Sequence, residues 1–284
     1  MQKSSLTNVH KFLTLAMALL LCSGISLQAA SVFAVVKATS AMPSDDGNLH
    51  ADFKAAIANQ TLVVYPNALA DTALRDAGNS TYYDHGATTN TVGGGSGGRG
   101  GLFRFDLSVI PGFHAGTVIR AEMRVRQNAG NGGDRTVAKV ITHAWSEGNK
   151  VANFPGVAPA ARGASFCHPN GLNTKVDQDK DGGVTGPLAS WGPNSDSRFD
   201  KDVDTAGARF FKGTVGGTNP QWVVFDITDL VTEWHNGTAP NYGVYLNGFN
   251  NNYQYYLREY GSATEPVLFI EYDPPPVGTS IIIR

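Results

Sequence analysis

The chain has few cysteines, few charges and no apolar run long enough to span a membrane. Only two of its 284 residues are cysteine, and charged residues make up 16%. So few cysteines exclude a disulfide-rich scaffold, and the low charge with 33 glycines disfavours a helical bundle or coiled coil. Basic residues number 22 and acidic residues 24, so nothing in the composition indicates nucleic-acid binding. Hydrophobic residues at 42% exclude wholesale disorder.

The N-terminus has the pattern of a secretory signal peptide. Two lysines precede a short apolar run over residues 12–21, and small residues follow. The run is about half the ~20 residues of a membrane span. We therefore expect a signal over residues 1–30, cleaved after Ala29 or as late as Ala34, and a chain that is secreted, extracellular or on the cell surface, with no membrane insertion after signal removal. A lipoprotein anchor on Cys22 is a minor alternative, because leucine precedes it where a small residue is usual.

Signal removal leaves Cys167 as the one cysteine, so the exported chain can form no internal disulfide. A domain of this size without disulfides depends on its core and on bound ions for stability. We expect no zinc site, because the seven histidines form no HxH or HxxxH pair and no second cysteine supports Cys167.

Alternating hydrophobic segments predict an all-β protein. In TVIRAEMRVR at 117–126 the apolar residues share one face and the charged residues the other, which is typical of a half-buried antiparallel strand with a solvated charged face. Further strands are expected at 61–65, 101–107, 135–145, 221–227, 242–247 and 266–272. The predicted fold is an antiparallel β-sandwich, jelly-roll-like, with long loops and one short helix.

The short helix is predicted at 228–234, with Thr228 capping its first turn, and a second helical pattern lies around 51–58. We expect residues 31–60 to be a linker or N-terminal extension and residues 61–273 to form the sandwich. The last eleven residues begin with three prolines and are expected to form a stiff tail over 274–284.

The glycine tract at 93–101 matches both GxGxxG and GxSxG. Dinucleotide binding and a nucleophile elbow both require a helix after the glycines, whereas a strand is predicted here. We interpret the tract as a glycine-rich loop and assign no catalytic residue.

Alternating aspartates suggest a structural calcium ion. Asp177, Asp179 and Asp181 precede two glycines, and the carbonyl of Val184 can supply a further oxygen. The pattern is incomplete, because Leu188 occupies the position where an EF-hand has glutamate. A solvated loop whose Asp and Gly residues simply make turns is the alternative.

Tyrosines and amides gather between residues 242 and 260. Flat aromatic faces stack on sugar rings and amides bond their hydroxyls, so Tyr253, Tyr255 and Tyr256 are candidate ligand-binding residues. Ordinary strand packing is the alternative, since roughly half of these rings should face the core by period alone. Arg258 is a candidate contact for a carboxylate, which would suit an acidic polysaccharide.

These segments together resemble the DNRLRE domain, a family related to family 96 carbohydrate-binding modules. The resemblance covers about residues 61–273 and is carried by DTALRDAGNSTYYDHG at 71–86, GLFRFDLSVIP at 101–111, TVIRAEMRV at 117–125, AWSEG at 144–148, FDITDLVTEWHNG at 225–237, NYGVYLNG at 241–248, LRE at 257–259 and PVLFIEY at 266–272. Two features depart from the family pattern: 166–168 replaces W-x-x-R, and 253–256 replaces the first letters of the name motif. The resemblance implies a β-sandwich on an exported protein and a glycan ligand such as alginate.

In the LRE segment, Arg258 and Glu259 are adjacent and would point to opposite faces of a strand. An internal ion pair, with Arg104 or Asp106 as partner, is the structural interpretation.

Three functions of different class follow. The first is a non-catalytic module that binds polysaccharide, stabilised by calcium. The second is a structural cell-surface or matrix protein that makes protein contacts. The third, a polysaccharide-degrading enzyme, is disfavoured because one module accounts for nearly the whole chain.

Overall fold

A computed structural model describes residues 30–45, 48–74, 90–93, 100–129, 136–140, 144–145, 147, 210–215, 220–248 and 253–275. The aspartate loop over 177–184, Cys167 and the tail beyond 275 lie outside these residues, so the structure does not test the predictions made for them. Within the described part, no helix has the length and apolarity that a membrane crossing requires.

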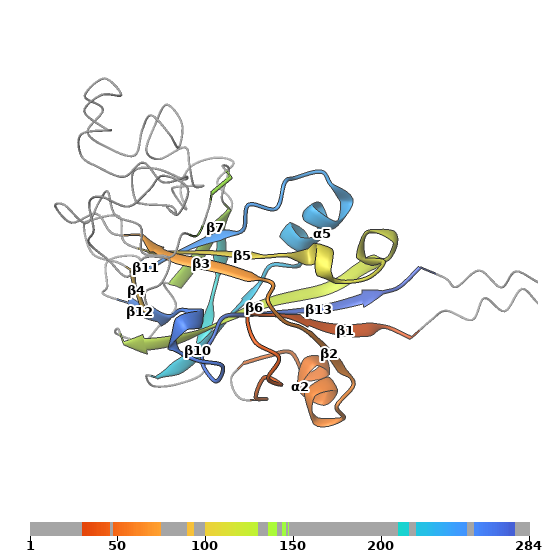
Figure 1. The fold of residues 1–284 in the computed structure, drawn as a ribbon, viewed down its shortest axis with the longest axis horizontal. Helices are drawn as coiled ribbons and strands as arrows, with labels where there is room; N and C mark the ends of the chain where they lie inside the picture. The colour runs from red at the N-terminus through yellow and green to blue at the C-terminus, as the bar shows by residue number, and fades with distance from the viewer. Residues whose placement is uncertain are drawn as a thin grey trace, which may run out of the picture.

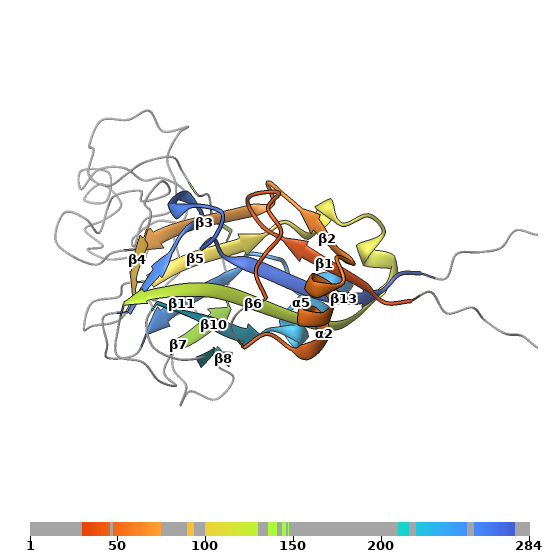
Figure 2. The ribbon, with the colours of Figure 1, turned by 90° about the horizontal axis from the view of Figure 1, so that it is seen from below.

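The described residues are mostly strands, arranged in two sheets (Figures 1 and 2). The first sheet contains β1 (Val32–Val36), β2 (Leu62–Tyr65), β4 (Asn90–Gly93), β6 (Thr117–Ala129), β9 (Thr214–Val215), β10 (Gln221–Asp226), β12 (Tyr253–Tyr256) and β13 (Val267–Asp273). The second contains β3 (Leu69–Leu74), β5 (Gly100–Phe105), β7 (Thr136–Val140), β8 (Phe210–Lys212) and β11 (Val244–Gly248). Every described pair is antiparallel except β1 with β2. The predicted all-β class is confirmed.

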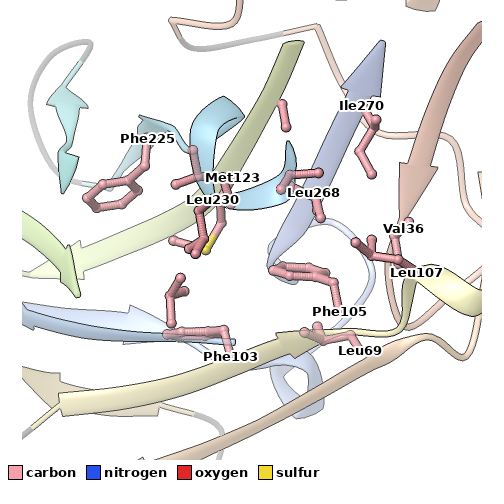
Figure 3. Packing of buried hydrophobic residues seen from close by; sticks show 14 of the residues in the cluster. Val36, Leu69, Phe103, Phe105, Leu107, Met123, Phe225, Leu230, Leu268 and Ile270 are labelled. Carbon is pink, nitrogen blue, oxygen red and sulfur yellow. The ribbon is translucent and has the colours of Figure 1, made fainter. Parts of the chain in front are cut away.

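Both sheets contribute to one hydrophobic core (Figure 3). Phe103 and Phe105 enter it from β5, Met123 from β6 and Phe225 from β10, and all four are 0% exposed. Burying each side chain of this size contributes about 1.5–3 kcal/mol. The helix α5 (Thr228–Asn236) closes the core with its buried apolar face, which includes Leu230, as its sequence pattern predicts.

The charged face of β6 is largely covered, which corrects the prediction of a solvated face. Glu122 and Arg124 are buried, and Arg120 and Arg126 are half-buried. Arg124 is 1% exposed, and its guanidinium lies 4.1 Å from the ring centre of Trp222 and 5.2 Å from that of Phe269. It donates to the Ser44 carbonyl at 3.0 Å, while Glu122 accepts the His50 backbone N–H at 3.0 Å. The segment that covers this face comes from the N-terminal part of the chain, which sequence periodicity on β6 alone does not reveal.

The N-terminal segment, expected as a linker or N-terminal extension, contributes a strand and a helix to the described fold. The helix α2 (Ala51–Ala58) inserts Phe53 into a second apolar cluster on the outer side of the first sheet, where it packs against Phe269. Strand β1 lies between β13 and β2. The structure thus has two short α-helices in its described part where one was assigned, and α2 occupies the place of the second helical pattern.

The start of α5 is capped differently from the prediction. Thr228 is already helical, and the side chain of Asp226 accepts its backbone N–H at 3.0 Å. The Thr228 hydroxyl instead accepts the backbone N–H of Ala121 at 2.9 Å, which ties the helix to β6. The helix ends at Gly237, whose φ of +69° is the left-handed conformation that glycine adopts at no steric cost.

Candidate functional site

Three segments that are distant in the sequence bring four charged side chains together. Arg258 and Glu259 belong to a single 3-10 turn, η5 (Arg258–Tyr260), which directly follows β12. Asp71 comes from β3 in the other sheet, and Glu147 comes from the segment after β7. We call these four residues the acidic cluster.

Arg258 is the centre of the acidic cluster. Its Nη2 lies 2.8 Å from Glu147 Oε1 and its Nε lies 2.8 Å from Glu259 Oε1. Its Nη1 donates to the Leu69 carbonyl at 2.8 Å, and its backbone N–H donates to Asp71 Oδ2 at 2.9 Å. The guanidinium therefore joins β3, the Glu147 segment and η5 at one point.

The 3-10 turn explains why Arg258 and Glu259 meet. Neighbouring residues of a strand point to opposite faces, as the sequence led us to expect, but in η5 their side chains form an ion pair. The expected partners of this ion pair are engaged elsewhere. Arg104 donates to the Trp145 carbonyl at 3.0 Å, and its guanidinium lies 5.1 Å from the centre of the Trp145 ring. Asp106 accepts the Ser108 N–H at 3.0 Å.

Burial makes negative charge costly in the cluster. Asp71 is 0% exposed, and desolvation raises its pKa well above the usual value, with the charges of Glu259 and Glu147 adding to the effect. Burial likewise raises the pKa of Glu147 to about 7. The Asp71 N–H, which Glu147 accepts at 3.1 Å, and the charge of Arg258 oppose this rise. Two buried oxygens, Asp71 Oδ1 and Glu259 Oε2, have no hydrogen-bond partner among the described residues. Three carboxylates and one guanidinium thus leave excess negative charge in a partly buried site.

A stacked pair of tyrosines flanks the same turn. The ring centres of Tyr256 and Tyr260 lie 3.8 Å apart at an interplanar angle of 30°, and Tyr260 is 50% exposed. The Tyr256 hydroxyl donates to Asn128 Oδ1 at 2.6 Å, and the Asn128 amide lies 3.5 Å from the Gln254 amide oxygen. A hydrogen bond with Tyr260, together with burial, raises the pKa of Tyr256. The result is an accessible aromatic face bordered by two amides.

The tyrosines predicted to bind a ligand differ in how far they are exposed. Tyr255 is 0% exposed and belongs to the core, so its ring offers no face to a ligand. Tyr256 supports Tyr260 from beneath and is 8% exposed. The side chain of Tyr253 lies outside the described part. Arg258 keeps a side-chain exposure of 33%, but its guanidinium is engaged by carboxylates of the same chain.

Sequence reasoning singled out neither Asp71 nor Glu147, and it gave no separate role to Tyr260. Asp71 and Glu147 both lie in segments that resemble the DNRLRE domain, and this resemblance was the signal that could have drawn attention to them. Spacing could not join them, because Asp71 and Arg258 are 187 positions apart.

Comparisons with known proteins identify no relative. No family model matches the chain, and no curated protein matches it.

Proposed function

We propose that this chain is an exported, non-catalytic module that binds polysaccharide. In this proposal its two sheets form a jelly-roll-like sandwich of the DNRLRE type. The observation that carries the proposal is the aromatic face formed by Tyr256 and Tyr260 beside the amides of Asn128 and Gln254. Export rests on the signal-like N-terminus.

The chemistry of this face suits a sugar ring. The outer ring, Tyr260, is half exposed, and Tyr256 holds it from the other side, so a pyranose can stack on it with little loss of side-chain freedom. Amides beside it can donate to and accept from hydroxyl groups. The fork of Arg258 is occupied by Glu147 and Glu259, which favours a neutral polysaccharide over the acidic one considered from the sequence.

A binding role is preferred to catalysis because of how the carboxylates are held. Glu147 and Glu259 each lie 2.8 Å from the same guanidinium, and Asp71 has no exposed surface. Groups fixed in this way stabilise a loop, whereas a general acid must reach the substrate atom that it protonates.

The test is affinity electrophoresis of the full chain in gels that contain neutral or acidic polysaccharides. Tyr260→Ala should weaken retention on the bound polysaccharide by about tenfold, because it removes the stacking face. The matched control is Ile119→Ala. Ile119 is 40% exposed and lies near the opposite end of β6 from the residues that pair with β12.

Equal retention of Tyr260→Ala and the wild type would refute the aromatic face as the binding site. No retention on any polysaccharide would favour the structural alternative, a surface or matrix protein that contacts other proteins. Depolymerisation of a polysaccharide by the purified chain would contradict the non-catalytic assignment.

A further inference from the structure

The acidic cluster has more negative charge than its own cation balances. Asp71, Glu147 and Glu259 share Arg258. Among the described residues, Arg104 also acts on Glu147 through space, but its side chain is directed to the Trp145 carbonyl and ring. Carboxylates that are removed from water without enough positive charge are costly, so the site requires a proton or a cation.

The unpartnered oxygens show where a cation would fit. Asp71 Oδ1 is buried, accepts no hydrogen bond and lies 4.0 Å from Arg258 Nε, so it is directed into the cluster. Glu259 Oε2 is also buried and accepts no hydrogen bond, while the other oxygen of Glu259 is paired with Arg258. A buried oxygen without a partner has lost its hydration without compensation, and a bound cation would restore that interaction.

The spacing of the three carboxylates matches one ion. One oxygen from each of Asp71, Glu147 and Glu259 can be chosen so that all three lie within 4.8 Å of one another. Oxygens that ligate one Ca²⁺ at about 2.3–2.6 Å are separated by no more than roughly twice that distance. The donors are all hard oxygens, which excludes a preference for soft metals.

We propose that Asp71, Glu147 and Glu259 bind one hard divalent cation, of which Ca²⁺ is the representative. Two charges from the ion and one from Arg258 balance the three carboxylates. The ion joins β3, the Glu147 segment and η5, and so fixes the turn that also carries Tyr260. Its ligands are other residues than those of the predicted aspartate loop over 177–184, and the argument for the ion does not rest on the proposed polysaccharide binding.

The experiment is a titration of the chelator-stripped full chain with Tb³⁺, followed by competition with Ca²⁺, Mg²⁺ and Mn²⁺. Tb³⁺ emits when a nearby tryptophan is excited, and Trp145 precedes Glu147 by two positions. We expect saturable emission that Ca²⁺ displaces. Glu147→Gln and Glu259→Gln should each weaken Ca²⁺ affinity by more than about tenfold. Each variant removes a carboxylate that binds the ion itself, which costs more affinity than removing a residue that only orients a ligand.

The matched control is the triple variant Asp177→Asn, Asp179→Asn, Asp181→Asn, which removes the alternative calcium loop. It should keep the emission and the affinity of the wild type. Trp145→Phe removes the tryptophan that excites Tb³⁺ and keeps all three carboxylate ligands. It should lower the Tb³⁺ emission, while its Ca²⁺ affinity measured by calorimetry stays within about twofold of the wild type.

Two results would overturn the proposal. One is the absence of Ca²⁺, Mg²⁺, Mn²⁺ and Tb³⁺ binding, which would mean that protons alone neutralise the cluster. The other is binding that the triple aspartate variant abolishes and that Glu147→Gln and Glu259→Gln leave intact. If either glutamine variant fails to fold, the triple variant and Trp145→Phe still decide between the two sites.

Discussion

At the scale of single residues, Arg258 shows how one side chain can link segments that are distant in the sequence. It contacts Glu147, Glu259, the Leu69 carbonyl and Asp71 at the junction of both sheets. Removing one partner of a buried ion pair destabilises the fold by more than the pair stabilises it, because the remaining charge is left buried without a partner. Arg258 and Glu259 belong to the LRE segment that resembles the DNRLRE motif, and the contacts described for them in this structure are internal.

Glu147 predicts an unusual pH dependence for the metal-free chain. Its pKa of about 7 in the folded state lies above the ordinary glutamate value of 4.5, so folding favours the protonated form. The stabilisation is fully present below the unfolded pKa and is lost as the pH rises through about 7. In chelator, the free energy of unfolding should therefore fall between pH 5 and pH 8.5, by up to about 3 kcal/mol for this 15%-exposed group.

Urea denaturation at several pH values measures this effect. Glu147→Gln should remove the part of the decline that belongs to Glu147, since glutamine cannot ionise, while the raised pKa of Asp71 leaves a slope of the same sign. A variant with the same slope as the wild type would show that Glu147 is not the titrating group.

At the scale of elements, the turn into β11 depends on a close approach of two backbones. Gly243 has φ = +85°, and a Cβ on it would collide with the carbonyl oxygen of Phe103 in the neighbouring strand β5. The backbone of a larger residue would have to move away from β5, which would disturb the core residue Phe103. Nearby, Asn241 donates to the Phe105 carbonyl at 2.7 Å and so holds the same junction.

Gly243→Ala should accordingly destabilise the chain much more than Gly237→Ala. Gly237 also has a positive φ, +69°, but a Cβ there meets nothing within 4 Å. The control should lose about 1 kcal/mol from the left-handed backbone alone, whereas Gly243→Ala should lose several kcal/mol more from the collision. Thermal and urea unfolding of the two variants measures the difference, and equal losses would contradict the close approach.

At the scale of the whole molecule, the N-terminal segment completes the first sheet. Ala34, Val35 and Val36 are 0% exposed, and β1 pairs with β13 from Val32 onward. The first and last described strands are therefore neighbours, and Ser31 donates to Asp273 at 2.8 Å across them. Cleavage after Ala34 would remove three of the five residues of β1, whereas cleavage after Ala29 leaves the strand whole.

We therefore expect a chain that begins at residue 30 to be more stable than one that begins at residue 35. The shorter chain loses strand hydrogen bonds worth about 1 kcal/mol each and the burial of Ala34 and part of Phe33. Urea midpoints of the two chains measure the difference, and the mass of the processed protein tests the cleavage point directly. A processed chain that begins at residue 35 with undiminished stability would contradict this role of β1.

The sequence by itself predicted the helix α5, the all-β class and the strands β2, β5, β6, β7, β10, β11 and β13, because strand and helix periodicities are local properties of the chain. It did not predict β1, whose residues were expected to form a linker or N-terminal extension. Alternation in β6 separated two faces, but only the tertiary structure decided that the charged face is covered by residues from 42 to 58. The acidic cluster was likewise decided by packing. Asp71 and Arg258 are 187 positions apart, and contacts at such separations depend on how the two sheets meet and not on any local pattern.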